Sequence, residues 1–143
     1  MRFLRLFALI GIPLILIVSN VAIYVVKITL SSEAIPTLVS GIASSTSIIV
    51  GFSGTLLGLM FREIKWKNGL TYKVQIVIAA AIIGLVISAG QLWLAFLSLS
   101  QSYYIDAVRN SLSGLLISLC TLFGLAIIII DKMLESLDSA REF

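Results

Sequence analysis

Four long apolar stretches constrain this chain more than any other feature of its sequence. Residues 6–26, 34–61 and 74–105 contain no charged side chain, and residues 108–130 contain only Arg109. About twenty helical residues, each rising 1.5 Å, cross the roughly 30 Å hydrocarbon core of a bilayer. The sequence therefore predicts an all-α membrane protein, a four-transmembrane-helix bundle with helices at about residues 6–27, 37–61, 74–98 and 108–131.

The overall composition agrees with a chain that lies almost entirely in lipid. Hydrophobic residues make up 59% of the 143 residues, and the mean hydropathy is +1.13, which exceeds what one soluble core can bury. We therefore expect a single membrane domain over residues 1–143. Residues 131–143 continue a helical pattern with apolar side chains on one face and acids on the other, which predicts an amphipathic cytoplasmic tail.

The basic residues predict which side of the membrane each loop faces. Short cytoplasmic loops are enriched in lysine and arginine, so we expect both termini to be cytoplasmic, together with the connector between the second and third helices. We expect the chain to be a multi-pass protein of the plasma membrane. The net charge of +3 indicates topology and contact with lipid headgroups, and no nucleic acid partner is expected. The cytoplasmic basic connector carries Arg62, Lys65, Lys67 and Lys73.

The loops on the opposite side are nearly free of net charge. Lys27 and Glu33 lie between the first two helices, and Asp106 and Arg109 lie at the start of the fourth. Asp106 and Arg109 are three residues apart, so we expect them to pair on one helical turn.

Small residues recur along three of the predicted helices at alternating spacings of four and three. This spacing keeps them on one side of a helix, where small side chains allow a second backbone to approach closely. Such small-xxx-small packing predicts helix-packing or interface surfaces. The residues are Ser40, Ser44, Ser47, Gly51, Gly54 and Gly58 in the second helix, Gly84 and Ser88 in the third, and Gly114 and Ser118 in the fourth.

Three uses of these surfaces remain open. They can meet one another inside a protomer, or the second helix can join copies of the chain or other membrane subunits. They can also line a solute pathway rich in serine, glycine and threonine. The polar residues at membrane depth, expected to form hydrogen bonds or line such a pathway, are Asn20, Gln91 and Thr121.

The sequence offers little for catalysis. It contains no histidine and only one cysteine, Cys120, so the usual general base and the common soft metal ligands are missing. We expect no enzymatic activity, no metal and no cofactor. The sequence favours a small non-catalytic protein that acts as a structural or accessory subunit of a membrane complex; the alternative is a small homo-oligomeric channel or transporter.

Overall fold

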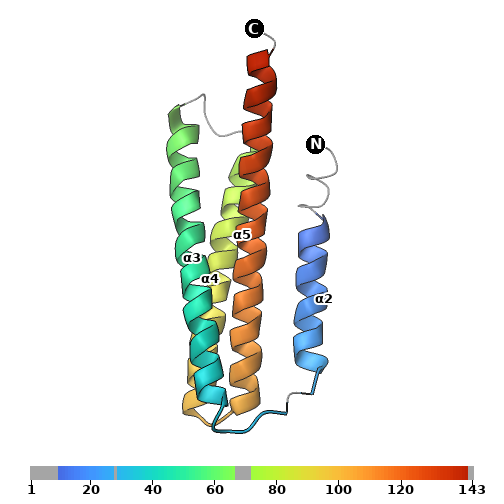
Figure 1. Cartoon of the computed structure of the whole chain (residues 1–143), viewed down its shortest axis with the longest axis vertical. Coiled ribbons are helices and arrows are strands. Elements are labelled where there is room, and N and C mark those ends of the chain that lie inside the picture. The colour runs from blue at the N-terminus through green and yellow to red at the C-terminus, as the bar shows by residue number, and fades with distance from the viewer. Residues whose placement is uncertain (1–9, 28, 67–71, 142–143) are drawn as a thin grey trace.

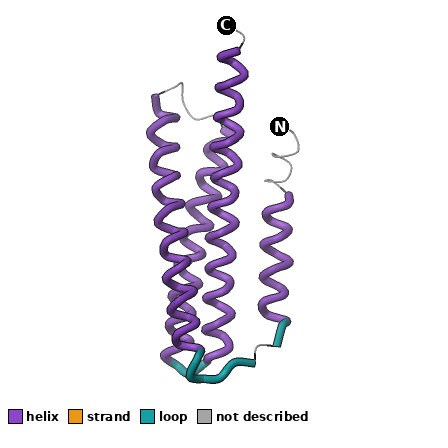
Figure 2. The backbone as a smooth tube through the Cα atoms, in the orientation of Figure 1, coloured by secondary structure: helices purple, strands orange, loops and turns teal. Residues whose placement is uncertain are grey.

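In the residues that it describes, the computed structural model is all-α with four α-helices (Figures 1 and 2). It describes residues 10–27, 29–66 and 72–141, with the backbone alone for residues 63–66, 72–74 and 135–141. The predicted all-α fold with four helices is confirmed. The helices, labelled as in Figure 1, are α2 (Ile12–Val25), α3 (Ile35–Trp66), α4 (Tyr72–Ser100) and α5 (Tyr104–Arg141).

Within the described residues, three helices are long and apolar enough to cross a membrane. The candidate spans are Ile35–Arg62, Gln75–Ser100 and Tyr104–Leu134, whereas α2 is a shorter apolar helix of 14 residues. The length and composition of these helices indicate a multi-pass membrane protein, and their many exposed apolar side chains suit contact with a lipid bilayer. Which side of the membrane the termini face stays a prediction.

The helices α3, α4 and α5 are longer than predicted. The helices α3 and α5 continue past the apolar stretches, because the polar residues that follow include good helix formers and residues 131–141 contain no glycine or proline. The helix α4 begins at Tyr72 and ends at Ser100, two residues beyond the predicted bounds at each end. The predicted tail is therefore a continuation of α5. The first helix was predicted over 6–27; residues 6–9 lie outside the described residues, and α2 ends at Val25 in a run of β-branched residues.

The helix α5 holds the others together. It packs along α4 and α3, and α2 lies on its other side, with its contacts chiefly to α5 (Figure 1). None of the described α2 residues is buried, so this helix is the least embedded element of the fold.

The interior has two apolar ends and a polar middle. Toward the α4–α5 turn, an apolar cluster contains Ile35, Val39, Ala95, Ala107 and Val108, and toward the other end a second cluster contains Leu57, Met60, Ile78, Ala81 and Leu125. In each long helix the buried hydroxyl residues lie between these two clusters. They are Thr46, Ser53, Ser88, Ser111, Ser113 and Ser118.

These hydroxyls mostly find their partners at short range. Thr46 donates to the carbonyl of Ile42 at 2.8 Å, and Ser111 and Ser118 donate to carbonyls of their own helix. Ser88 and Ser113 donate to acceptors on other helices, and the Oγ of Ser53 is buried with no hydrogen-bond partner among the described residues. A helix can carry a buried serine or threonine in an apolar setting because its own backbone accepts the proton.

The α4–α5 turn is a helix C-cap of the Schellman type. The amide of Tyr103 donates to the carbonyl of Ser98 at 2.8 Å, and the amide of Ser102 donates to the carbonyl of Leu99 at 3.1 Å. Ser102 has a φ of 62°, a left-handed conformation that is unfavourable for a residue with a Cβ. The cap reverses the chain within a few residues and sets α5 antiparallel to α4.

Replacement of Ser102 by glycine is expected to stabilise the protein. Glycine removes the Cβ strain in the left-handed region, so the free energy of unfolding should rise by about 0.5–1 kcal/mol after the larger entropy of the unfolded chain is included. The midpoint of thermal unfolding in detergent measures the change. Ser100→Gly is the matched control, because Ser100 is helical and donates to the carbonyl of Leu97; it should lower the midpoint. A lower midpoint for Ser102→Gly would contradict the assigned strain.

Candidate functional site

Glycine allows α4 and α5 to pack closely. A Cβ added at Gly114 would lie 3.2 Å from the carbonyl oxygen of Ser88 and 3.3 Å from the Cβ of Gln91. A Cβ added at Gly84 would lie 2.5 Å from the Oγ1 of Thr121. The hydroxyl of Ser88 donates to the carbonyl of Gly114 at 2.7 Å, so a buried hydrogen bond joins the two helices. The structure thus brings the small residues of α4 and α5 together inside one protomer.

The small residues of α3 are arranged differently. Ser40, Ser44, Ser47, Gly51, Gly54 and Gly58 are all exposed, and we call this row the outer seam. A Cβ added at Gly51, Gly54 or Gly58 would meet no atom of another described residue within 4 Å. The inward side of α3 is formed instead by other residues, among them Val39 and Leu57. The outer seam therefore faces away from the other described helices.

The hydroxyls beside the outer seam are satisfied by their own helix. Ser44 donates to the carbonyl of Ser40 at 3.0 Å, Ser47 to that of Ala43 at 2.8 Å, and Thr55 to that of Gly51 at 3.0 Å. A hydroxyl bonded in this way can face lipid or another helix without the cost of an unpaired donor. The seam can accept a close apolar contact without a specific polar partner.

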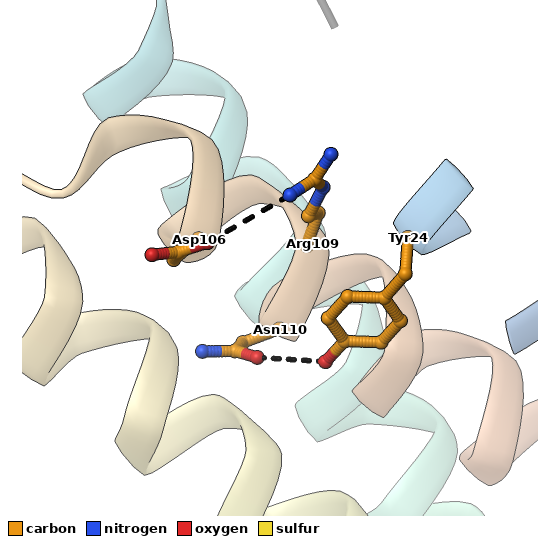
Figure 3. A network of polar contacts seen from close by, with 4 residues as sticks. All are labelled: Tyr24, Asp106, Arg109 and Asn110. Carbon is orange, nitrogen blue, oxygen red and sulfur yellow. Dashed lines mark hydrogen bonds and ion pairs between the residues drawn. The ribbon is translucent and has the colours of Figure 1, made fainter. Parts of the chain in front are cut away.

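A set of polar contacts attaches α2 to α5 (Figure 3). The Tyr24 hydroxyl donates to the Oδ1 of Asn110 at 3.1 Å, and the Arg109 guanidinium lies 5.9 Å from the centre of the Tyr24 ring. The Nη1 of Arg109 is 3.9 Å from the Oδ1 of Asp106, so the predicted pairing of these two residues is confirmed. The ion pair is long and Asp106 is exposed, so it adds little to stability.

One turn further into the bundle, Asn20 makes the second attachment of α2. The Ser113 hydroxyl donates to the Oδ1 of Asn20 at 2.5 Å, and the Nδ2 of Asn20 donates to the carbonyl of Leu16 at 2.9 Å. Both polar ends of the Asn20 amide are thus used. In an apolar medium such interhelical hydrogen bonds contribute on average about 0.6 kcal/mol each.

The sequence reasoning missed Tyr24, Asn110 and Ser113 as partners in this attachment. The signal was available: Asn20 and Tyr24 are four residues apart on α2, and Asn110 and Ser113 are three apart on α5. Each pair therefore lies on one face of its helix. Two polar faces in otherwise apolar helices predict a contact between those helices.

The remaining predicted site residues are placed separately. Gln91 is half-buried beside Gly114, with its Oε1 buried and no partner among the described residues, and Thr121 donates to the carbonyl of Ile117 at 2.8 Å. In the basic connector, Arg62 is exposed near the end of α3. The side chains of Lys65 and Lys73 and the whole of Lys67 lie outside the described part, so the role of the connector stays a prediction.

No chemical centre is evident in the described part of the chain. There, no group of three or more histidine, cysteine, aspartate or glutamate residues could hold a metal ion. Compared with protein-family models, with curated proteins and with solved structures, the chain gives no significant match. The functional argument therefore depends on the helix surfaces.

The two kinds of glycine should respond oppositely to alanine. Gly114→Ala places a methyl group against a backbone oxygen, so the free energy of unfolding should fall by about 1–3 kcal/mol. Gly58→Ala is the matched control, because its methyl group meets open space and raises helix propensity by up to about 1 kcal/mol. Unfolding of monomeric protein by a denaturing detergent measures both changes. Equal effects of the two substitutions would contradict the assigned packing.

Proposed function

We propose that this chain is a small non-catalytic membrane protein that acts as a structural or accessory subunit of a membrane complex through the outer seam of α3. One observation carries the proposal. Gly84 and Gly114 are crowded by the facing helix, whereas Gly51, Gly54 and Gly58 face open space. The chain thus uses glycine for close packing between α4 and α5. It presents a second row of glycines on α3 that no described helix contacts closely.

The outer seam is costly unless a partner covers it. A glycine in a helix interior is about 1 kcal/mol less favourable than alanine, and three of them occupy one exposed row of α3. Lipid chains give helices no hydrophobic reason to associate, so association depends on close dispersion contacts that small residues permit. A second helix against Gly51, Gly54 and Gly58 would gain those contacts and offset the cost.

The arrangement of the helix ends supports the proposed topology. The start of α2, the end of α3, the start of α4 and the end of α5 lie at the same end of the molecule (Figure 1). The described residues on either side of the basic connector lie at that end, and the positive-inside rule favours placement of the connector in the cytoplasm. Both termini then face the cytoplasm, and we propose the plasma membrane as the location.

A double substitution in the outer seam tests the proposal. Gly51→Leu with Gly54→Leu should reduce the mass of the complex extracted in mild detergent, measured by native mass spectrometry, because leucine holds a partner backbone away. The protomer itself should keep its unfolding midpoint, since both glycines are exposed and a Cβ added at either position meets no described residue within 4 Å.

Gly41→Leu with Gly90→Leu is the matched control. Both glycines are also exposed and open, but Gly41 lies off the seam on α3 and Gly90 lies on α4. This variant should retain the parent mass. A complex of unchanged mass in the Gly51 and Gly54 double variant would refute the outer seam as an interface.

A channel or transporter formed by several copies is the second candidate. The hydroxyls of Ser40, Ser44, Ser47 and Thr55 lie on or beside the outer face of α3, and in a closed ring such a face can line a shared pathway. This function predicts solute flux into liposomes that Gly51→Leu abolishes while the ring keeps its mass. The subunit function predicts no flux from the parent chain and a loss of mass on substitution, so the two candidates give opposite results.

A further inference from the structure

An open depression lies at the end of the molecule formed by the α4–α5 turn, away from the outer seam. It has a volume of about 410 Å³ and is lined by Ser102, Tyr103, Tyr104, Ile105, Asp106 and Arg109. The depression is open to the surroundings, so it is a shallow surface site and not an enclosed cavity. The wall therefore combines a cation, an anion and aromatic rings within six residues.

Arg109 is held in place but is not fully paired. Its side chain is 23% exposed, its guanidinium lies over the Tyr24 ring, and Figure 3 shows it directed toward Asp106. Its Nε is buried with no hydrogen-bond partner among the described residues, and the 3.9 Å between Nη1 and Asp106 is too long for a good hydrogen bond. A guanidinium has five N–H donors in a planar fork that matches phosphate oxygens.

The length of the uncharged part of α5 suits a position of the depression near the lipid headgroups. Residues 110–130 of α5 carry no charge and separate Arg109 from Asp131, which are 22 positions apart. At 1.5 Å per residue this distance is about 33 Å, close to the thickness of the hydrocarbon core. A bilayer that covers this uncharged segment would have Arg109 at one boundary, and tyrosine is a residue type enriched at that boundary.

The charges at this end match a zwitterion better than an anion. The charged residues described there are two of each sign, Lys27, Glu33, Asp106 and Arg109, so they exert no net attraction on anionic lipid. Asp106 is 60% exposed and stands beside the exposed Tyr103. A carboxylate next to an aromatic ring suits an ammonium group, while Arg109 suits a phosphate.

We infer that the depression at the α4–α5 turn binds the headgroup of a zwitterionic phospholipid, with the phosphate on Arg109 and the ammonium group on Asp106. Phosphoethanolamine without acyl chains has the same headgroup chemistry and is the soluble alternative source. The lipid is favoured because the depression opens at the membrane boundary, where acyl chains can lie along the exposed apolar side of the bundle.

Binding of defined lipids to the purified full chain tests the inference. Native mass spectrometry in detergent would compare phosphatidylethanolamine, phosphatidylglycerol with the same acyl chains, and free phosphoethanolamine. The parent chain should prefer phosphatidylethanolamine over the other two. Arg109→Gln should weaken its binding about tenfold, the loss expected for one charge-assisted hydrogen bond. Lys27→Gln is the matched control, because it removes an exposed charge at the same end that does not line the depression, and its binding should be unchanged.

A second variant is needed because Arg109 also contacts Tyr24 of α2, so its replacement can disturb the attachment of that helix. Asp106→Asn leaves the fold intact because the side chain is exposed, and it should shift the preference toward phosphatidylglycerol because the cation then stands alone. Equal binding of both lipids by the parent chain, or no shift in Asp106→Asn, would overturn the inference. Equal affinity for free phosphoethanolamine would assign the site to a soluble ligand and overturn the lipid assignment.

Discussion

The close contact between α4 and α5 at Gly114 is the interaction on which the rest of the structure depends. Because Gly114 has no side chain, its carbonyl can accept the Ser88 hydroxyl at 2.7 Å, and the two backbones approach so closely that an added Cβ would lie 3.2 Å from the carbonyl oxygen of Ser88. This contact fixes α5 against α4, and α5 then supplies one surface to α3 and another to α2. A protein without a hydrophobic driving force between its helices is held by such short-range contacts.

The helices could be predicted from the sequence because each one contains a long apolar stretch with almost no charge. The charge-free stretches gave four helices in the correct places, and Asp106 and Arg109 gave a pair from spacing alone. The continuation of α5 to Arg141 differed because helix propensity does not stop at the edge of the lipid. The distribution of charge predicts an orientation that the arrangement of the helices does not test.

The roles of the small-residue rows could not be separated from the sequence. Gly54 in α3 and Gly114 in α5 each lie in a row of small residues that are three or four positions apart. Gly54 nevertheless faces open space, whereas Gly114 faces the backbone of another helix. The difference arises from the rotation of each helix about its axis, which the whole set of contacts determines. The hydrogen bond between Asn20 and Ser113 could not be predicted for a related reason. The spacing of polar residues identifies a polar face on α2 and another on α5, but it does not give the register in which the two helices pack.

The attachment of α2 has a consequence for the order in which the protein is built. Its two partners on α5, Asn110 and Ser113, lie 86 and 93 residues further along the chain than Tyr24 and Asn20. The hydrogen bonds that attach α2 to α5 therefore cannot form until α5 has been synthesised. Until then the Asn20 amide can form the bond to the Leu16 carbonyl of its own helix but lacks the Ser113 hydroxyl. This attachment is thus a late step in folding, because it joins the first and the last of the described helices.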